Sequence, residues 1–183
     1  MITGRVWKFG DDINTDLILP GSAIRESEEV QMREVFAANR PGWVDLVRPG
    51  DVLVAGKNFG MGSARPAPRS LRNLQLGFLV AEQVNGLFFR NCINFGFLAI
   101  DCPGVTAAFD EGDVARLDIE AWTLTNERTG AVLKPPAMPA RFLHMARSGG
   151  IYPMLEAEGL IAPLAPRAPA TRLADIPVKS AGD

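Results

Sequence analysis

The sequence is short of the residues on which several classes of protein depend. Its two cysteines, Cys92 and Cys102, are too few for a disulfide scaffold and are spaced unlike a zinc site. Its single histidine, His144, lies far along the chain and is the one candidate base for a Ser-His-Asp hydrolase. A Gly-x-Ser-x-Gly elbow is absent as well. We therefore expect both thiols to be small core residues and His144 to be a packed or surface residue.

Charge and hydropathy exclude two further classes. The net charge is −2 and the isoelectric point is near 5.5, whereas nucleic-acid-binding domains usually carry a basic surface. No stretch approaches the roughly 18 uncharged apolar residues that a membrane-spanning helix requires. Residues 1–12 lack the basic and then apolar segments of a secretion signal. The sequence thus predicts a cytoplasmic protein with reduced thiols that binds neither nucleic acid nor membranes.

The pattern of apolar residues predicts an α/β fold. The first part of the chain alternates helical patterns with short, wholly apolar strands, which is typical of parallel pairing, and a later run of strands predicts an antiparallel meander. Proline and alanine dominate after residue 162, so we expect one domain over residues 1–162 and a flexible or loosely docked tail over 163–183. The expected strands cover residues 4–9, 17–19, 52–55, 78–81, 97–100, 114–119, 122–125 and 131–133, and the expected helices begin at 27, at 66 or 68, at 87, at 140 and at 151.

The stretch with the strongest chemical content is GKNFGMGSARPAPRSL, residues 56–71. Gly60 and Gly62 allow a ligand to approach the main chain, Ser63 offers a hydroxyl, and Arg65 offers a planar cation that matches a carboxylate or phosphate. A strand that turns through glycines into serine and arginine ahead of a helix predicts an anion site. The two prolines that follow keep Ser63 and Arg65 on a stiff loop outside the helix. The alternative is a glycine turn with a solvated arginine.

Other motifs give partial signals. The loop at the start of this stretch, residues 56–66, is called the central loop below. It is not a phosphate-binding P-loop, and Pro66 stands where a dinucleotide fingerprint has its third glycine. A serine without a histidine partner is a poor base, so any chemistry at Ser63 needs nearby positive charge and donors, or another subunit. The acids in residues 11–16 lack the spacing of an EF-hand. Arg90 and Asn91 either tie helix ends together or approach the central loop.

Several segments match a known family in the right order. They are GRVWKFGDDINTDLILPG (4–21), VRPGDVLVAGKNFGMGS (47–63) and LFFRNCINFGFLAIDCPGV (87–105), with a looser match around GGIYPMLEAEGLI (149–161). They resemble the small subunit of 3-isopropylmalate dehydratase, which is the aconitase-superfamily swivel domain made as a separate chain. The resemblance implies a swivelling β/β/α fold that caps a large subunit, with the active site at the interface.

The resemblance also implies roles for individual residues. Enzymes of this family remove and re-add water on hydroxy di- or tricarboxylic acids. The serine after the glycine motif acts as an alkoxide that takes a proton from carbon, and the following arginine holds a substrate carboxylate. These roles fall on Ser63 and Arg65. The family's Thr-Asp pair falls on Thr15 and Asp16, with Asp16 near the acid–base network.

Substrate preference depends on less well matched positions. The loop after Pro20 maps to residues 21–26, which implies that Arg25 meets the distal end of the substrate. Gly62 and Ala64 flank the catalytic serine, but the family's usual Ser-Ser-Arg-Glu-His-Ala is here Ser-Ala-Arg-Pro-Ala-Pro, residues 63–68. The second serine and the Glu-His pair are lost. We hypothesise a paralogue that acts on another small hydroxy acid, such as a methyl-substituted malate, with 3-isopropylmalate itself still open.

The resemblance implies a 4Fe–4S cluster on three cysteines of the large subunit. The two cysteines of this chain are too few to hold it, so the cluster is expected on the partner. The rival hypothesis is a non-catalytic binding or regulatory protein that keeps the swivel fold and an anion pocket. Retention of Ser63 and Arg65 favours the enzyme.

Overall fold

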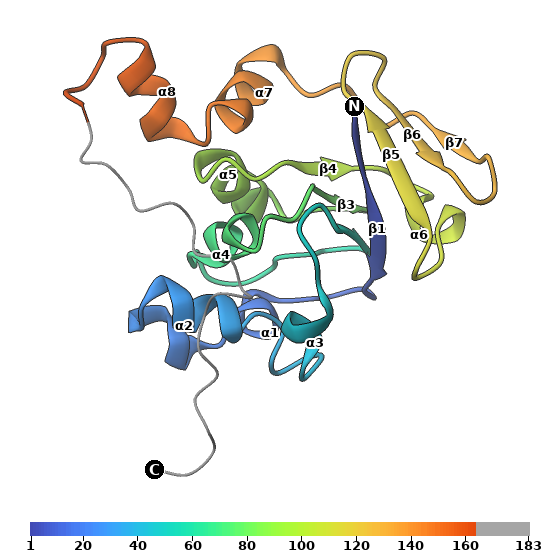
Figure 1. Ribbon diagram of the computed structural model, residues 1–183, viewed down its shortest axis with the longest axis horizontal. Coiled ribbons are helices and arrows are strands. Elements are labelled where there is room, and N and C mark those ends of the chain that lie inside the picture. The colour runs from blue at the N-terminus through green and yellow to red at the C-terminus, as the bar shows by residue number, and fades with distance from the viewer. Residues whose placement is uncertain (164–183) are drawn as a thin grey trace.

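The computed structural model describes residues 1–163 (Figure 1). Residues 164–183 lie outside the described part, and with them all but the first residue of the expected tail. No helix among the described residues is both long and apolar enough to span a membrane.

The strands form one mixed sheet, in agreement with the predicted α/β class. They are β1 (Ile2–Lys8), β2 (Val52–Ala55), β3 (Leu79–Ala81), β4 (Ala99–Asp101), β5 (Val114–Asp118), β6 (Thr123–Asn126) and β7 (Val132–Leu133). Their order in the sheet is β4-β3-β2-β1-β5-β6-β7. Strands β1 to β4 pair in parallel, and β5 to β7 add the predicted antiparallel meander. Strand β1 joins the two halves, because its end pairs with β2 and its beginning with β5.

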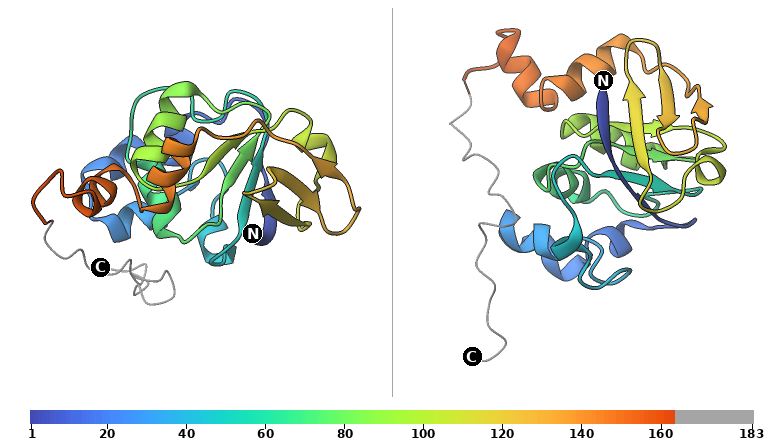
Figure 2. Two further views of the ribbon diagram at one scale, coloured as in Figure 1. Left: turned by 90° about the horizontal axis from the view of Figure 1, so that it is seen from above. Right: turned by 45° about the vertical axis from the view of Figure 1, so that its right-hand side comes forward.

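The helices follow the parallel strands and the meander. They are α1 (Thr15–Ile18), the 3-10 helix η1 (Gly21–Arg25), α2 (Glu28–Arg33), α3 (Trp43–Leu46), α4 (Ala67–Asn73), α5 (Gly86–Asn94), α6 (Val105–Ala108), α7 (Ala140–Arg147) and α8 (Ile151–Ala157). In Figure 1 the helices α1 to α5 lie on one side of the parallel strands, and β5 to β7 lie on the other side with α6. Figure 2 shows the same separation from two further directions.

Each face of the sheet covers its own hydrophobic cluster. Leu53 of β2 belongs to the cluster under α1 to α5, whereas the neighbouring Val52 and Val54 belong to the cluster on the side of α6 and the meander. Successive side chains of a strand point to opposite faces, so a strand that is covered on both sides is apolar throughout. All four residues of β2 are accordingly buried.

The prediction of a strand over residues 17–19 is wrong. The Asn14 side chain accepts a hydrogen bond from the Leu17 N–H (2.9 Å), and the chain turns into α1 instead. An amide oxygen at this position satisfies a backbone donor at the start of a helix, which outweighs the strand preference of a short apolar run. The turn buries Thr15 and Ile18.

Other boundaries differ by small amounts. The strand predicted from residue 97 begins two residues later, at Ala99, and α2 ends at Arg33. The expected apolar residues Val35 and Phe36 are buried in the turns after α2, not within it. The short helices η1, α3 and α6 were not predicted, because each has at most five residues and too little periodicity to detect.

Candidate functional site

Two loops that follow neighbouring parallel strands lie side by side. Strands β1 and β2 end at the same edge of the sheet, so residues 10–16 run along residues 56–62. The Gly60 N–H donates to the Ile13 carbonyl (2.7 Å), and the Thr15 N–H donates to the Met61 carbonyl (2.8 Å). Backbone hydrogen bonds therefore fix the central loop against the Thr15–Asp16 segment, which brings together two motifs separated by more than forty residues of sequence.

The structure explains why positions 60 and 62 of the central loop are glycines. Gly60 has φ +81°, and a Cβ there would lie 2.1 Å from Cγ of Phe88. Gly62 has φ +106°, and a Cβ there would lie 2.9 Å from Oγ1 of Thr15. Both positions combine left-handed backbone with a close neighbour, so only glycine fits without displacement. The loop thereby passes close above α5 and against Thr15.

Arg65 is the best-defined side chain of the site. Its Nη2 lies 2.7 Å from Oδ1 of Asp16, and the Arg65 side chain is 13% exposed whereas that of Asp16 is 63% exposed. The Nε and Nη1 atoms of Arg65 are buried and have no hydrogen-bond partner within residues 1–163. Oγ1 of Thr15 is likewise buried and has no hydrogen-bond partner within residues 1–163. A cluster of unused donors beside a single carboxylate is suited to binding an anion.

Gly21 is a neighbour of Arg65 that sequence reasoning missed. A Cβ at Gly21 would lie 3.1 Å from Nη1 of Arg65 and 3.8 Å from Oδ1 of Asp16. The resemblance places Gly21 at the start of the loop of residues 21–26, but nothing in the sequence indicates that this glycine lies beside Arg65. In the structure it starts η1, so the loop of residues 21–26 begins directly against the arginine.

Ser63 lies where the sequence predicts, on the loop ahead of α4. Pro66 caps that helix, which begins at Ala67, within one residue of the predicted start. Ser63 and the neighbouring Ala64 are exposed outside the helix. Arg25 is the last residue of η1 and is also exposed, and it forms no hydrogen bond or ion pair with any residue the structure describes.

The remaining candidates lie elsewhere. His144 is exposed on α7, 3.6 Å from Glu158, as predicted for a surface residue. Arg90 is exposed on α5, and Phe88 of the same helix is the residue that approaches Gly60.

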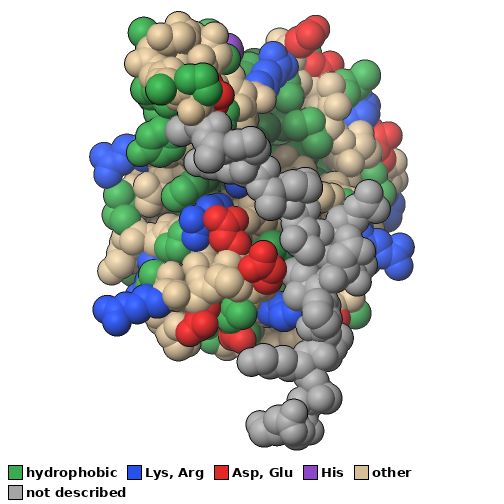
Figure 3. Space-filling view, turned by 60° about the vertical axis from the view of Figure 1, so that its left-hand side comes forward, with side chains coloured by type: hydrophobic (Ala, Val, Ile, Leu, Met, Phe, Trp, Pro, Cys, Tyr) green, Lys and Arg blue, Asp and Glu red, His purple; other side chains and the backbone are tan. Residues whose placement is uncertain are grey.

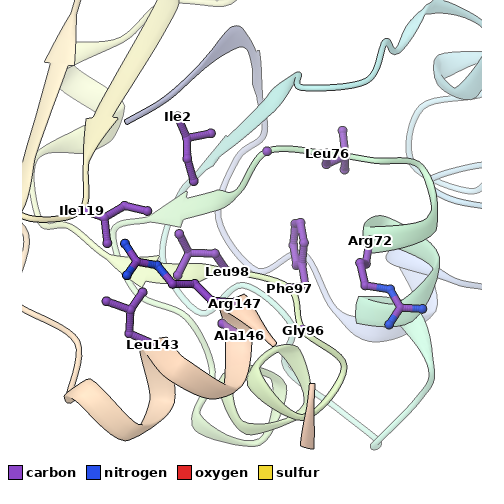
Figure 4. A pocket seen from close by; sticks show the side chains of 11 residues that line it. Ile2, Arg72, Leu76, Gly96, Phe97, Leu98, Ile119, Leu143, Ala146 and Arg147 are labelled. Carbon is purple, nitrogen blue, oxygen red and sulfur yellow. The ribbon is translucent and has the colours of Figure 1, made fainter. Parts of the chain in front are cut away.

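A pocket under α7 is lined by Arg147 and apolar side chains such as Leu98 and Leu143 (Figure 4). None of its lining residues belongs to the two loops, so this pocket is separate from the site.

The cysteines do not fit an iron–sulfur cluster. Cys92 is buried in the cluster under α1 to α5, whereas Cys102 is buried in the cluster on the opposite face of the sheet. Burial raises the pKa of the Cys92 thiol well above its usual range and raises the pKa of Cys102 to about 11, with a further contribution from Glu82. Metal ligation requires the thiolate, which both sites disfavour. Among the described residues no group of His, Cys, Asp and Glu is arranged to hold a metal ion.

Comparisons with known proteins find relatives that cover most of the chain. The isopropylmalate/citramalate isomerase small subunit of Methanocaldococcus jannaschii is 36% identical over 158 residues, which cover 85% of this chain and 94% of that protein. The homoaconitase small subunit of Thermus thermophilus is 38% identical over 158 residues, covering 85% of this chain and 96% of that protein. No protein-family model matches the chain.

A solved structure extends the likeness to the fold. The crystal structure of 3-isopropylmalate dehydratase from Methanocaldococcus jannaschii superposes with a TM-score of 0.82 and 28% sequence identity, over 87% of this chain and 95% of that one. The expected swivel-domain fold is thereby confirmed. The chain therefore belongs to the family of small subunits of 3-isopropylmalate dehydratase and homoaconitase, and it is the small subunit of a hydro-lyase of that type.

Proposed function

We propose that this chain supplies the base and a carboxylate-binding arginine to a dehydratase-isomerase that acts on a small hydroxy di- or tricarboxylic acid. Ser63 is the base, and Arg65 binds a substrate carboxylate. The observation that carries the proposal is the Arg65 guanidinium, which is held between Asp16 and Gly21 with unused donors, two residues after an exposed serine. The large subunit is proposed to carry the 4Fe–4S cluster, because the thiols of this chain are not suited to ligate it.

The chemistry follows from the charges around the serine. The Ser63 hydroxyl gives its proton to solvent, and the alkoxide then takes a proton from a substrate carbon while hydroxide leaves the neighbouring carbon and the C=C bond forms. In the return step hydroxide adds to the carbon that lost the proton, and Ser63 gives its proton to the other carbon, which yields the isomer and restores the alkoxide. A serine hydroxyl is far too weak an acid to ionise alone, so fixed positive charge and donors must stabilise the alkoxide. Arg65 provides that charge, and Thr15 provides a further donor.

The substrate is proposed from the relatives and from the motif. The relatives carry names for isopropylmalate, citramalate and homoaconitase activities. In this chain Ala64 replaces the second serine of the usual motif, which removes one hydroxyl from the exposed loop beside Ser63. We propose a malate with a small alkyl substituent as the substrate. A site with fewer polar contacts is better matched to a substrate that carries fewer carboxylates and hydroxyls.

The test is anaerobic co-expression with a large subunit encoded in the same genome. The complex is assayed with malates bearing isopropyl or methyl substituents and with homoaconitase-type tricarboxylates, and the ultraviolet absorbance of the unsaturated product is followed. We expect turnover of at least one compound. The Ser63→Ala variant should assemble normally and lose at least about 100-fold in kcat.

The matched control is Ser148→Ala, at the end of α7 and outside both loops, which should keep wild-type turnover. Near-normal turnover of Ser63→Ala removes Ser63 from the role of base. A stable complex with an intact cluster that is silent toward every compound supports the non-catalytic binding or regulatory alternative. A failure to form any complex contradicts the proposed partnership itself.

A further inference from the structure

Gln31 is a buried polar residue that the proposed mechanism does not use. It lies on α2 and is 2% exposed, although glutamine is usually a surface residue. A buried amide without hydrogen-bond partners would destabilise the fold. The partners of the Gln31 amide therefore indicate which segments this residue connects.

The amide of Gln31 holds both sides of Arg25. Its Nε2 donates to the carbonyl of Ile24 (3.2 Å) and to the carbonyl of Glu26 (2.9 Å). Both hydrogens of the NH2 group are thereby used on the residues before and after Arg25. Because the Arg25 side chain has no partner of its own within residues 1–163, its position depends on this backbone.

The oxygen of the same amide is hydrogen-bonded to α4, the helix that follows the central loop. Oε1 of Gln31 accepts a hydrogen bond from Nη2 of Arg69 (3.0 Å), and Arg69 lies on α4 four residues after Arg65. The orientation of the amide is dictated by these partners, because a flipped amide would face two carbonyls with its oxygen and a guanidinium with its NH2 group.

Further contacts stiffen this link. Nη1 of Arg69 lies 3.2 Å from Oε1 of Glu28, and the other oxygen of Glu28 accepts from Nδ2 of Asn73 (2.7 Å). Figure 3, which brings the side of α2 and α4 forward, shows acidic and basic side chains close together on this face. Two features thus relate the loop of residues 21–26 to the segment that bears Arg65: Gly21 lies beside the Arg65 side chain, and the Gln31 amide joins the backbone around Arg25 to Arg69 of α4.

We propose that Gln31 is a positioning residue for substrate selection, which fixes Arg25 at a set distance from Ser63 and Arg65. The inference rests on the proposed function and adds a residue to it. With one end of the substrate on Arg65, the distance to Arg25 decides which substituent fits at the other end. A displacement of about 1 Å in such a contact is enough to alter reactivity strongly.

The experiment measures selectivity, not only activity. In the assembled complex, Gln31→Leu keeps the apolar bulk of the side chain and removes the hydrogen bonds on both sides. We expect the ratio of kcat/KM between the isopropyl- and methyl-substituted malates to change by about tenfold, mainly through KM. A ratio of two substrates does not depend on the fraction of folded enzyme, so a purely structural loss leaves it unchanged.

The matched control is Asn126→Leu, because Asn126 is also a fully buried amide, whose Nδ2 bonds Ala108 and Asp113 on the far side of the sheet. It should lower stability but leave the ratio at the wild-type value. If Gln31→Leu fails to assemble, Arg69→Met acts on the same link from its partly exposed end and should shift the ratio in the same direction.

The outcomes separate the two proposals. If the wild-type complex is active and Ser63→Ala is not, but Gln31→Leu and Arg69→Met keep the ratio within about twofold, the role of Gln31 is overturned and the role of Ser63 stands. If the wild-type complex is silent toward all substrates, the proposed function fails and the role of Gln31 fails with it. Rescue of the ratio in Gln31→Glu would also contradict the proposal, since a carboxylate keeps the acceptor for Arg69 but loses both donors to the loop.

Discussion

The Arg65 side chain forms an ion pair with Asp16 and lies beside Gly21. Asp16 supplies a carboxylate at 2.7 Å, and Gly21 brings backbone against the guanidinium where a larger residue would intrude. Since the Asp16 side chain is largely exposed, the pair is partly solvated and adds little to stability by itself. The ion pair matters because it orients the Arg65 guanidinium, whose other N–H donors have no partner in the described structure.

A second charged cluster, around Asp113, serves the fold and not the site. The buried carboxylate of Asp113 accepts hydrogen bonds from the Arg128 side chain, from Nδ2 of Asn126 (2.6 Å) and from the Asp110 N–H (2.9 Å). The Arg128 hydrogen bonds hold the pKa of Asp113 well below its usual range, opposed in part by burial. A lowered folded-state pKa stabilises the fold above the unfolded pKa of about 3.9 and loses that contribution as the pH falls below it.

We therefore predict that Asp113→Asn lowers the free energy of unfolding at pH 7 by about 1–3 kcal/mol, because charge-assisted hydrogen bonds are lost. The difference from wild type should shrink as the pH falls below about 4. Urea unfolding of the small subunit at several pH values measures both. Asp45→Asn, at an exposed residue without an ion pair in the described structure, should show neither effect. If the difference in the free energy of unfolding between wild type and Asp113→Asn stayed constant with pH, the stabilising role of the ionised Asp113 carboxylate would be contradicted.

At the scale of secondary structure, the central loop depends on what lies beneath it. Gly60 and Gly42 both have left-handed backbone, with φ +81° and +78°. They differ in their surroundings, because a Cβ on Gly42 meets nothing within 4 Å, whereas one on Gly60 meets the Phe88 side chain of α5. Alanine substitutions at these two glycines therefore separate the free-energy cost of the left-handed backbone from the cost of a clash with Phe88.

We predict that Gly42→Ala lowers the free energy of unfolding by about 1 kcal/mol, the cost of the backbone alone. Gly60→Ala should cost a further 1–3 kcal/mol, roughly, because Phe88 or the loop must move. Chemical denaturation of the two variants under the same conditions measures the difference. Equal losses would show that the loop has room above α5.

For the whole molecule, the sheet divides the core into two clusters and places one cysteine in each. Cys92 and Cys102 lie in the clusters on opposite sides of the sheet, so the folded chain does not bring the two thiols to one metal ion. This separation supports the proposal that the iron–sulfur cluster belongs to the large subunit.

We predict that the double variant Cys92→Ala with Cys102→Ala, assembled anaerobically with the large subunit, contains as much iron per complex as the wild type. The buried thiols should also react slowly with a thiol reagent in the folded chain, because their pKa values are raised. Iron analysis and the visible spectrum of the complex are the measurements. A loss of iron in the double variant, with assembly intact, would make this chain a contributor of cluster ligands.

Much of the architecture follows from local patterns. Wholly apolar runs such as residues 52–55 indicate strands covered on both faces, and Pro66 indicates where α4 begins. The glycines and Ser63 and Arg65 identify the candidate loop, because they are adjacent along the chain. Local patterns failed at residues 17–19, where an apolar run became part of a helix because the Asn14 side chain accepts a cap hydrogen bond from the Leu17 N–H.

The site as an assembly depends on contacts between distant segments. Periodicity and turn residues describe the chain over a few neighbours, so they specify the elements and the loop that bears Ser63. They contain no information on the contact of Gly21 with Arg65, or on the link from Gln31 to Arg69, which span 44 and 38 residues. These arise because adjacent parallel strands bring their following loops to one edge, and because α2 packs beside α4.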